Sequence, residues 1–148
     1  MKKILVFVLL CLGIFGGIYA FGSTQTSKPK TYVLLAHKTF FVDLAETKTV
    51  QQKGLSGRVS LPTDEGMLFL FEKPGDYGFW MEDMLFPLDI IWISPDWHVT
   101  HIEHSIATST YPTVFYAHIP SQYVLEISAG EASKLDVHVG DTVQYLEK

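Results

Sequence analysis

Short apolar runs separated by turn residues constrain the fold of this chain more than any other feature. Each run is rich in β-branched or aromatic residues and is bounded by Gly, Pro, Asp or Ser, a pattern typical of β-strands. The runs predict about nine short strands, at residues 32–35, 39–44, 67–71, 77–81, 88–94, 97–106, 114–117, 123–128 and 142–146. Strands this short and numerous favour a β-barrel or a β-sandwich over a helical fold.

Two segments predict short helices. In residues 47–58, Thr47 can cap the first turn, and Gly54 or Gly57 can end the helix. A second short helix and a turn precede the last strand, and this pattern from Ala132 to Val143 is similar to the helix–turn–strand unit of small pseudo-symmetric barrels. We therefore predict a mainly β (α+β) domain, a small closed or partly closed barrel with two short helices.

The N-terminal residues have the pattern of a targeting segment. Lys2 and Lys3 precede residues 4–22, which carry no charged side chain. Residues 1–22 are thus predicted to be a signal peptide or an N-terminal membrane anchor. Residues 23–30 are predicted to be a linker, and residues 31–148 a single domain. The domain is expected to be exported, in the periplasm or another extracytoplasmic space, and membrane contact is expected only through residues 4–22, in the cytoplasmic (inner) membrane.

Composition excludes several classes of function. Cys11 is the only cysteine and lies in the targeting segment, so the domain is expected to have no disulfide and no cysteine-based zinc site. A net charge of −5 argues against nucleic acid as a partner. No Gly-rich phosphate loop and no G-x-S-x-G motif are present, and the spacing of His98, His101 and His104 on a strand does not fit a zinc site. We therefore predict no catalytic residue, no metal and no cofactor, and we favour a non-enzymatic role.

Asp89 lies inside the apolar sequence "FPLDIIWI" and is the first candidate for a functional residue. Side chains alternate on a strand, so Asp89 is expected to share one face with Ile91 and Ile93. A buried carboxylate requires a hydrogen-bond donor, and Arg58 is the best candidate because its guanidinium can donate two parallel bonds. This pair could lock a loop to the barrel, or it could belong to a ligand pocket in which Arg58 meets an anionic group.

The pocket hypothesis predicts a cleft between the loop from Arg58 to Glu65 and the segment from Trp80 to Asp89. The unknown partner is then a small anionic or polar ligand, or an envelope protein. The predicted ligand-binding residues are Arg58, Asp64, Glu65, Trp80, Met81 and Asp89. Glu126, which lies in the similar apolar sequence "YVLEIS", is instead assigned a structural role.

Two alternative functions stay open. A hydrolase of envelope polysaccharide would need two facing carboxylates, and Asp64, Glu65, Asp83 and Asp89 are the candidates. A copper-binding module would use thioether and imidazole ligands, which suit Cu(I). This alternative predicts Met81 or Met84 exposed beside a histidine, whereas core packing predicts both to be buried.

Three segments carry a resemblance to a known family. "GLSGRVSLPTDEGMLFLF" (residues 54–71), "FWMEDMLFPLDIIWI" (residues 79–93) and "YVLEISAGEASKLDVHVGD" (residues 123–141) resemble the bacterial and archaeal domain of unknown function 192, DUF192. The resemblance implies a compact, mainly β fold in a protein that is exported or membrane-anchored. It implies no mechanism. Ser56 stands where many members have a methionine.

Overall fold

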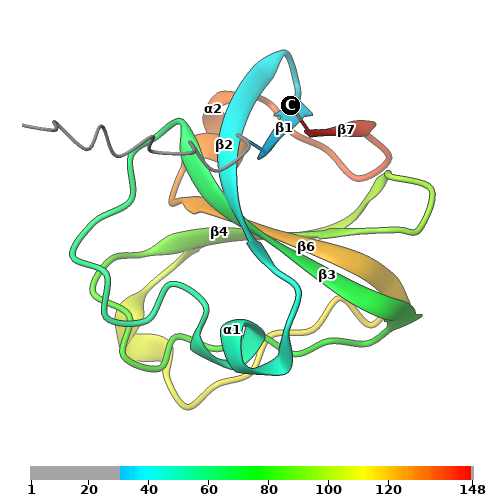
Figure 1. The fold of residues 1–148 in the computed structure, drawn as a ribbon. Coiled ribbons are helices and arrows are strands. Elements are labelled where there is room, and N and C mark those ends of the chain that lie inside the picture. Colours follow the sequence, from blue (N-terminus) through cyan, green and yellow to red (C-terminus); the bar gives the residue numbers. More distant parts are fainter. Residues whose placement is uncertain (1–30, 148) are drawn as a thin grey trace, which may run out of the picture.

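The computed structural model describes residues 31–147, which form seven β-strands, two α-helices and one 3₁₀ helix (Figure 1). The predicted targeting segment (residues 1–22) and linker (residues 23–30) lie outside the described residues. Within residues 31–147, no helix is long and apolar enough to cross a membrane. The strands are β1 (Thr31–Leu35), β2 (Lys38–Ala45), β3 (Glu65–Gly75), β4 (Leu88–Ile93), β5 (Val99–Ile106), β6 (Ser121–Ser128) and β7 (Val143–Glu147). The helices are α1 (Lys48–Lys53), the 3₁₀ turn η1 (Thr108–Thr110) and α2 (Glu131–Lys134).

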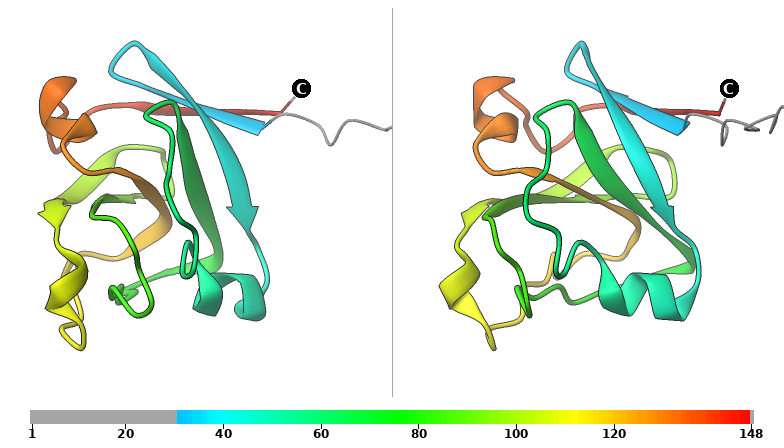
Figure 2. Two further views of the ribbon diagram at one scale, coloured as in Figure 1. Left: turned by 90° about the vertical axis from the view of Figure 1, so that its left-hand side faces the viewer. Right: turned by 60° about the vertical axis from the view of Figure 1, so that its left-hand side comes forward.

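The seven strands form one sheet in the order β5-β4-β6-β3-β2-β1-β7. All neighbours are antiparallel except β2 and β3, which are parallel and are connected through α1. The edge strands β5 and β7 do not pair along their length, but a single bridge joins His98 to Thr142. Beside it, the Val99 amide donates to the Asp141 carbonyl at 2.9 Å. The predicted mainly β fold is confirmed, as a partly closed barrel (Figure 2).

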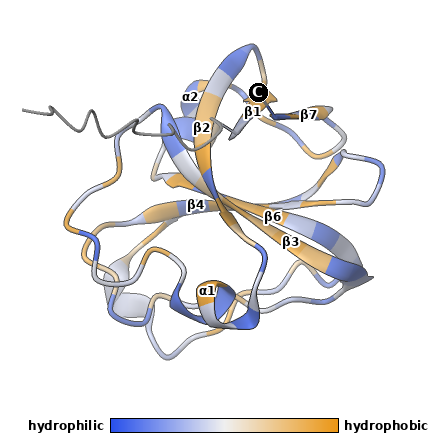
Figure 3. Cartoon of the chain, viewed as in Figure 1, coloured by the Kyte–Doolittle hydropathy of each residue, from blue (hydrophilic) through white to orange (hydrophobic). Residues whose placement is uncertain are grey.

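The two faces of the central strands bury two separate apolar clusters. On β4, Ile91 and Ile93 point into the barrel, while Leu88, Ile90 and Trp92 point outward, as strand alternation predicted. The outward side chains are not exposed, because a second layer covers them. The inner cluster is completed from β1, β2 and β7, and the outer one from the segments that surround α1. Figure 3 shows the hydrophobic residues gathered on the crossing central strands.

The second layer explains why two predicted strands, at residues 77–81 and 114–117, are absent. These segments meet through one bridge only, in which the amides of Phe79 and Phe115 each donate to the other's carbonyl, at 2.9 and 2.8 Å. Their apolar side chains cover the outer face of the sheet instead of extending it. An apolar run of this length predicts burial correctly but cannot distinguish a strand from a covering loop.

The helix predicted at residues 47–58 is shorter than expected. Thr47 caps α1 as predicted, with its hydroxyl accepting from the Val50 amide at 3.3 Å. Gly54 ends the helix with a φ of +51°, a conformation that side-chain-bearing residues rarely adopt. The chain after Gly54 is therefore free to turn back across the sheet.

Replacing Gly66 with alanine should destabilise the domain by about 1–3 kcal/mol, because the added methyl group overpacks the sheet. A Cβ at Gly66 would lie 2.7 Å from the Glu126 carbonyl oxygen, so β3 and β6 would have to move apart. Gly75→Ala on the same strand is the control, since its Cβ would come no closer than 3.1 Å to any atom and would meet a side chain, Tyr77, instead of the backbone of a neighbouring strand. Urea unfolding of both variants measures the difference, and equal stabilities would contradict the prediction.

Candidate functional site

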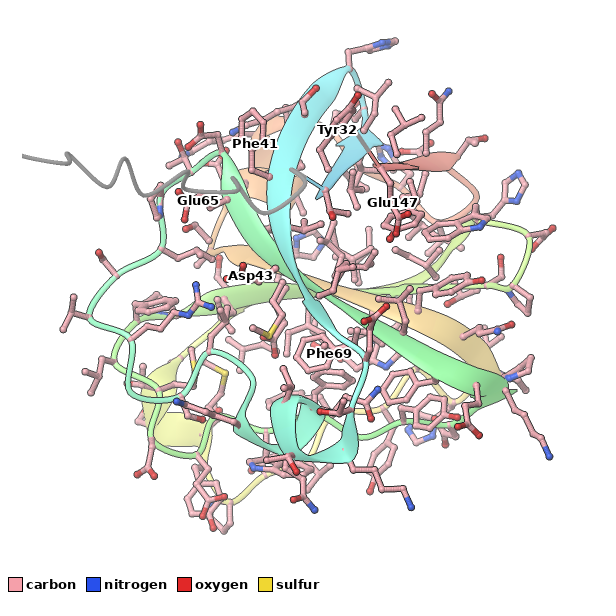
Figure 4. The ribbon with its side chains drawn as sticks, viewed as in Figure 1. Tyr32, Phe41, Asp43, Glu65, Phe69 and Glu147 are labelled. Atoms are coloured by element: carbon pink, nitrogen blue, oxygen red, sulfur yellow. The ribbon has the colours of Figure 1, made fainter. Side chains whose placement is uncertain are left out.

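A pocket of about 190 Å³ opens in the second layer, between α1, the end of β3 and the segment around Phe79. Its walls are mainly aromatic, and its mouth carries polar residues of α1. Figure 4 shows the Phe69 side chain on β3 directed toward α1. The lining residues are Lys48, Gln51, Gln52, Lys53, Gly54, Leu55, Ser56, Phe69, Phe71, Tyr77, Gly78, Phe79, Trp80, Met84 and Glu126.

Glu126 supplies the only carboxyl group that lines this pocket. It lies on β6, paired across the ladder with Met67 on β3 and Ile90 on β4, and only 5 % of its surface is exposed. Its Oε2 atom is buried without a hydrogen-bond partner in the described part of the chain. Burial raises the pKa of Glu126 to about 8, and the Arg58 charge only partly offsets this effect. At neutral pH Glu126 is therefore mostly a neutral acid.

Gly54 brings the end of α1 close to this acid. A Cβ at that position would lie 3.8 Å from Glu126 Oε2 and 3.5 Å from the Phe69 ring. Because glycine has no side chain, the space that a Cβ would fill beside the carboxyl group stays open. The residue that ends the helix thus also keeps space open above Glu126.

Aromatic contacts fix the pocket walls. Phe71 and Tyr77 stack with ring centroids 3.5 Å apart, and Phe69 meets Phe79 edge to face at 4.8 Å. Trp80 is 39 % exposed, and its indole N–H donates to Glu82 at 3.3 Å. Rings that pack on one another hold their orientation, so the site is a formed cavity with a partly exposed indole at its mouth.

Asp89 has a different environment from the one predicted. It is fully buried and accepts three backbone N–H bonds: from Ser105 at 2.7 Å, from Gly130 at 3.0 Å and from Ala132 at 2.8 Å. The predicted bond from Arg58 is therefore wrong, since main-chain donors supply what the carboxylate needs. These bonds tie β5 and the start of α2 to β4, so Asp89 has a structural role.

Arg58 and the other predicted residues are likewise dispersed. Arg58 instead forms an ion pair with Asp43 on β2, with N···O at 2.6 Å. Asp64 and Glu65 are exposed, and Met81 is buried in the outer cluster. Of the predicted binding residues, only Trp80 lines the pocket. The loop from Arg58 to Glu65 does not line this pocket, so the pocket beside α1 differs from the cleft predicted from the sequence.

The residues proposed for the two alternative functions do not assemble either. Of the carboxylates suggested for a hydrolase, three are exposed: Asp64, Glu65 and Asp83. The fourth, Asp89, is buried and accepts hydrogen bonds from backbone amides. Met81 and Met84 are buried in the outer cluster, which is what core packing predicted. Across residues 31–147, no group of three or more His, Cys, Asp or Glu side chains is arranged to hold a metal.

Glu126 lines the pocket, although the sequence argument assigned it a structural role and left it out of the predicted binding residues. Its sequence context was the available signal, since "YVLEIS" places a carboxyl group between apolar neighbours just as "PLDII" does. The sequence cannot separate the two cases, because the donors of Asp89 are backbone amides without a side-chain signature. Only the fold shows that one acid is fully bonded while Glu126 Oε2 is not.

Comparison with known proteins agrees with this fold. Residues 32–145 match the model of the DUF192 family, which is described as "Uncharacterized ACR". The chain belongs to the DUF192 family. Its mainly β fold is the one that the resemblance implied, while the implied export is a separate matter that the match does not address. No curated protein matches the sequence.

Two crystal structures are similar to this DUF192 domain. One is of a protein of unknown function from Novosphingobium aromaticivorans, 36 % identical, with a TM-score of 0.70 over 78 % of this chain and 83 % of that one. The other is of a protein described as a putative transcription regulator from Sinorhizobium meliloti, 27 % identical, with a TM-score of 0.73 over 79 % of this chain and 92 % of that one.

Proposed function

We propose that this DUF192 protein is a non-enzymatic binding module that takes a small, largely apolar molecule into the pocket beside α1. The observation that carries the proposal is the buried Glu126 carboxyl, whose Oε2 atom faces no donor of the described chain. A polar group in an apolar site is costly unless it is paired, and a ligand would supply the missing partner. Apolar pockets with a few placed polar groups are the usual form of small-molecule sites.

The arrangement supports binding more than catalysis. Glycoside hydrolysis requires a pair of carboxyl groups, whereas Glu126 is the one carboxyl among the residues that line the pocket. Among the described residues, the lining holds no cysteine and no histidine. Its one serine, Ser56, donates its hydroxyl to the Glu82 carbonyl at 2.8 Å.

We place this module in the cell envelope as part of the same proposal. The support is the sequence of residues 1–22, in which two lysines precede an uncharged apolar segment. Protease treatment of intact spheroplasts tests the location. Digestion of the domain from outside is expected, and protection until the membrane is lysed would contradict an extracytoplasmic location.

Phenylethanol is a suitable neutral probe for the pocket, and fluorine NMR of protein labelled with 5-fluorotryptophan detects it. Binding should shift the resonance of Trp80, which lies at the pocket mouth. Trp97 is the internal control, because it stacks between Tyr123 and Tyr145 in the inner cluster. Its resonance should not move.

Two variants locate the binding site. Trp80→Ala should weaken phenylethanol binding by about five- to tenfold, in line with the loss of one aromatic contact surface. Arg58→Ala tests the cleft predicted from the sequence and should leave binding of this neutral probe within about twofold. The proposal is contradicted if phenylethanol does not bind, or if Arg58→Ala weakens binding and Trp80→Ala does not.

A further inference from the structure

We propose that the preferred ligand of the pocket is a protonated primary amine on a small apolar body, with its ammonium group bound to Glu126. This inference rests on the proposed function, since it names the chemical class of the ligand for the same pocket. It draws on three features of the site: the unpartnered acid, the aromatic walls and the limited volume.

The unpartnered acid favours a ligand that brings hydrogen-bond donors. Glu126 Oε2 receives no hydrogen bond from the described residues, so the Arg58 charge alone favours the carboxylate form and only partly offsets the cost of burial. An ammonium group carries three donors and a positive charge, and it can stabilise the carboxylate by both. A neutral ligand could accept a hydrogen bond from the protonated acid, but charge-assisted bonds are about twice as strong.

The aromatic walls favour a cation for a second reason. The faces of aromatic rings carry partial negative charge, and a cation placed over them is attracted most when it is shielded from water. Phe69, Phe71, Tyr77, Phe79 and Trp80 surround the space beside Glu126. An acid within a group of aromatic rings thus selects an ammonium group against a hydroxyl of the same size.

The volume limits the apolar body. A cavity of roughly 150 Å³ is known to hold benzene, and this pocket of about 190 Å³ is only slightly larger. The ligand is therefore expected to have one ring, or a short branched chain, joined to the amine by one or two carbons. Phenylethylamine has this size and shape.

The charged groups around the pocket act in opposite directions: the basic side chains attract an anion, whereas the Glu126 carboxylate attracts a cation. Lys48 and Lys53 on α1 are exposed at the mouth, and Arg58 lies farther along the chain. Tyr77 is the other titratable group of the wall, and the ladder neighbours of Glu126, Met67 and Ile90, are apolar. Exposed lysine charges are screened by solvent over about 8 Å at physiological salt. An anionic ligand is nevertheless the sharpest competitor, and phenylacetate represents it.

Binding of the amine should release a proton. The acid is neutral in most molecules at pH 7, so formation of the ion pair transfers the Glu126 proton to solvent while the ammonium keeps its own. With a pKa of about 8, the ionised fraction of Glu126 rises roughly fiftyfold between pH 6 and pH 8. The affinity for phenylethylamine should rise by a similar factor, whereas that for phenylethanol should change by less than about twofold.

The experiment is calorimetric titration of the full-length protein with phenylethylamine, phenylethanol and phenylacetate at pH 6 and pH 8. These probes differ mainly in one terminal group, which makes them a matched set. At pH 8 the amine should bind about tenfold more tightly than the alcohol, and phenylacetate should bind most weakly. Titrations in buffers of different ionisation enthalpy should show that close to one proton leaves at pH 6.

Glu126→Gln is the matched variant, because it keeps the shape of the side chain and removes the acid. It should lower the affinity for phenylethylamine at pH 8 by tenfold or more and leave phenylethanol within about threefold. Equal affinities of the wild type for phenylethylamine and phenylethanol at pH 8 would overturn the inference about the amine and leave the proposed function standing. Tightest binding by phenylacetate would also overturn it. Failure of all three probes would overturn the proposed function as well. If Glu126→Gln does not fold, the wild type still tests the inference: an affinity for phenylethylamine that does not rise from pH 6 to pH 8, or binding at pH 6 without proton release, would overturn it.

Discussion

Replacing Asp89 with alanine is expected to lower the free energy of unfolding by about 3–5 kcal/mol, the range typical of breaking a buried charged interaction. The carboxylate accepts three N–H bonds, and its removal leaves the amides of Ser105, Gly130 and Ala132 without their acceptor. A buried donor without a partner costs about 1–3 kcal/mol. Urea unfolding followed by circular dichroism measures the loss.

Asp43→Ala is the control for the Asp89 variant. Asp43 is also a strand carboxylate, and its ion pair with Arg58 is half exposed. Exposed pairs contribute about 0–1 kcal/mol, so this variant should stay close to the wild type. If Asp89→Ala lost no more stability than Asp43→Ala, the three backbone bonds would not have the structural importance argued above.

Replacing Glu126 with glutamine should stabilise the protein at high pH and change little at low pH. The pKa of Glu126 is raised in the folded protein from its ordinary 4.5 to about 8, so the folded state holds this proton more tightly than the unfolded chain does. The wild type is therefore most stable, with respect to this group, below pH 4.5 and loses stability as the pH rises toward 8. From pH 5 to pH 8.5 this amounts to about 3–4 kcal/mol. Glutamine does not titrate and escapes this loss.

The difference in unfolding free energy between Glu126→Gln and wild type, measured in urea at several pH values, isolates this effect. Other titrating groups contribute equally to both proteins and cancel. Glu65→Gln makes the same chemical change at an exposed position of β3, and its difference from wild type should not depend on pH in this way. Parallel stability curves for Glu126→Gln and wild type would show that the buried acid is not held neutral.

Strand periodicity predicted the interior of this fold better than its covering layer. On β4, alternation correctly placed Ile91 and Ile93 on the same face, because the side chains of a strand repeat with a period of two. It failed at residues 77–81 and 114–117, where apolar residues also gain burial without forming a ladder. Covering segments and strands bury similar side chains, so composition alone does not separate them.

The candidate site was only partly predictable for a related reason. Asp89 was correctly expected to be buried, and Glu126, the other acid in an apolar sequence, is buried as well. Which of them is satisfied depends on amides at Ser105, Gly130 and Ala132, and every residue except proline has such an amide. Trp80 was predicted to bind ligand and does line the pocket, while α1, which forms its mouth, was predicted only as a helix.

The pairing of β1 with β7 has a practical consequence for work with this protein. Thr31 lies opposite Glu147 in the ladder, so the two ends of the described domain are side by side. In Figures 1 and 2, α1 lies at the opposite end of the domain from them. A surface attached directly at Thr31 or Glu147 would therefore lie at the end of the domain away from α1 and its pocket, which would stay accessible to ligands in solution.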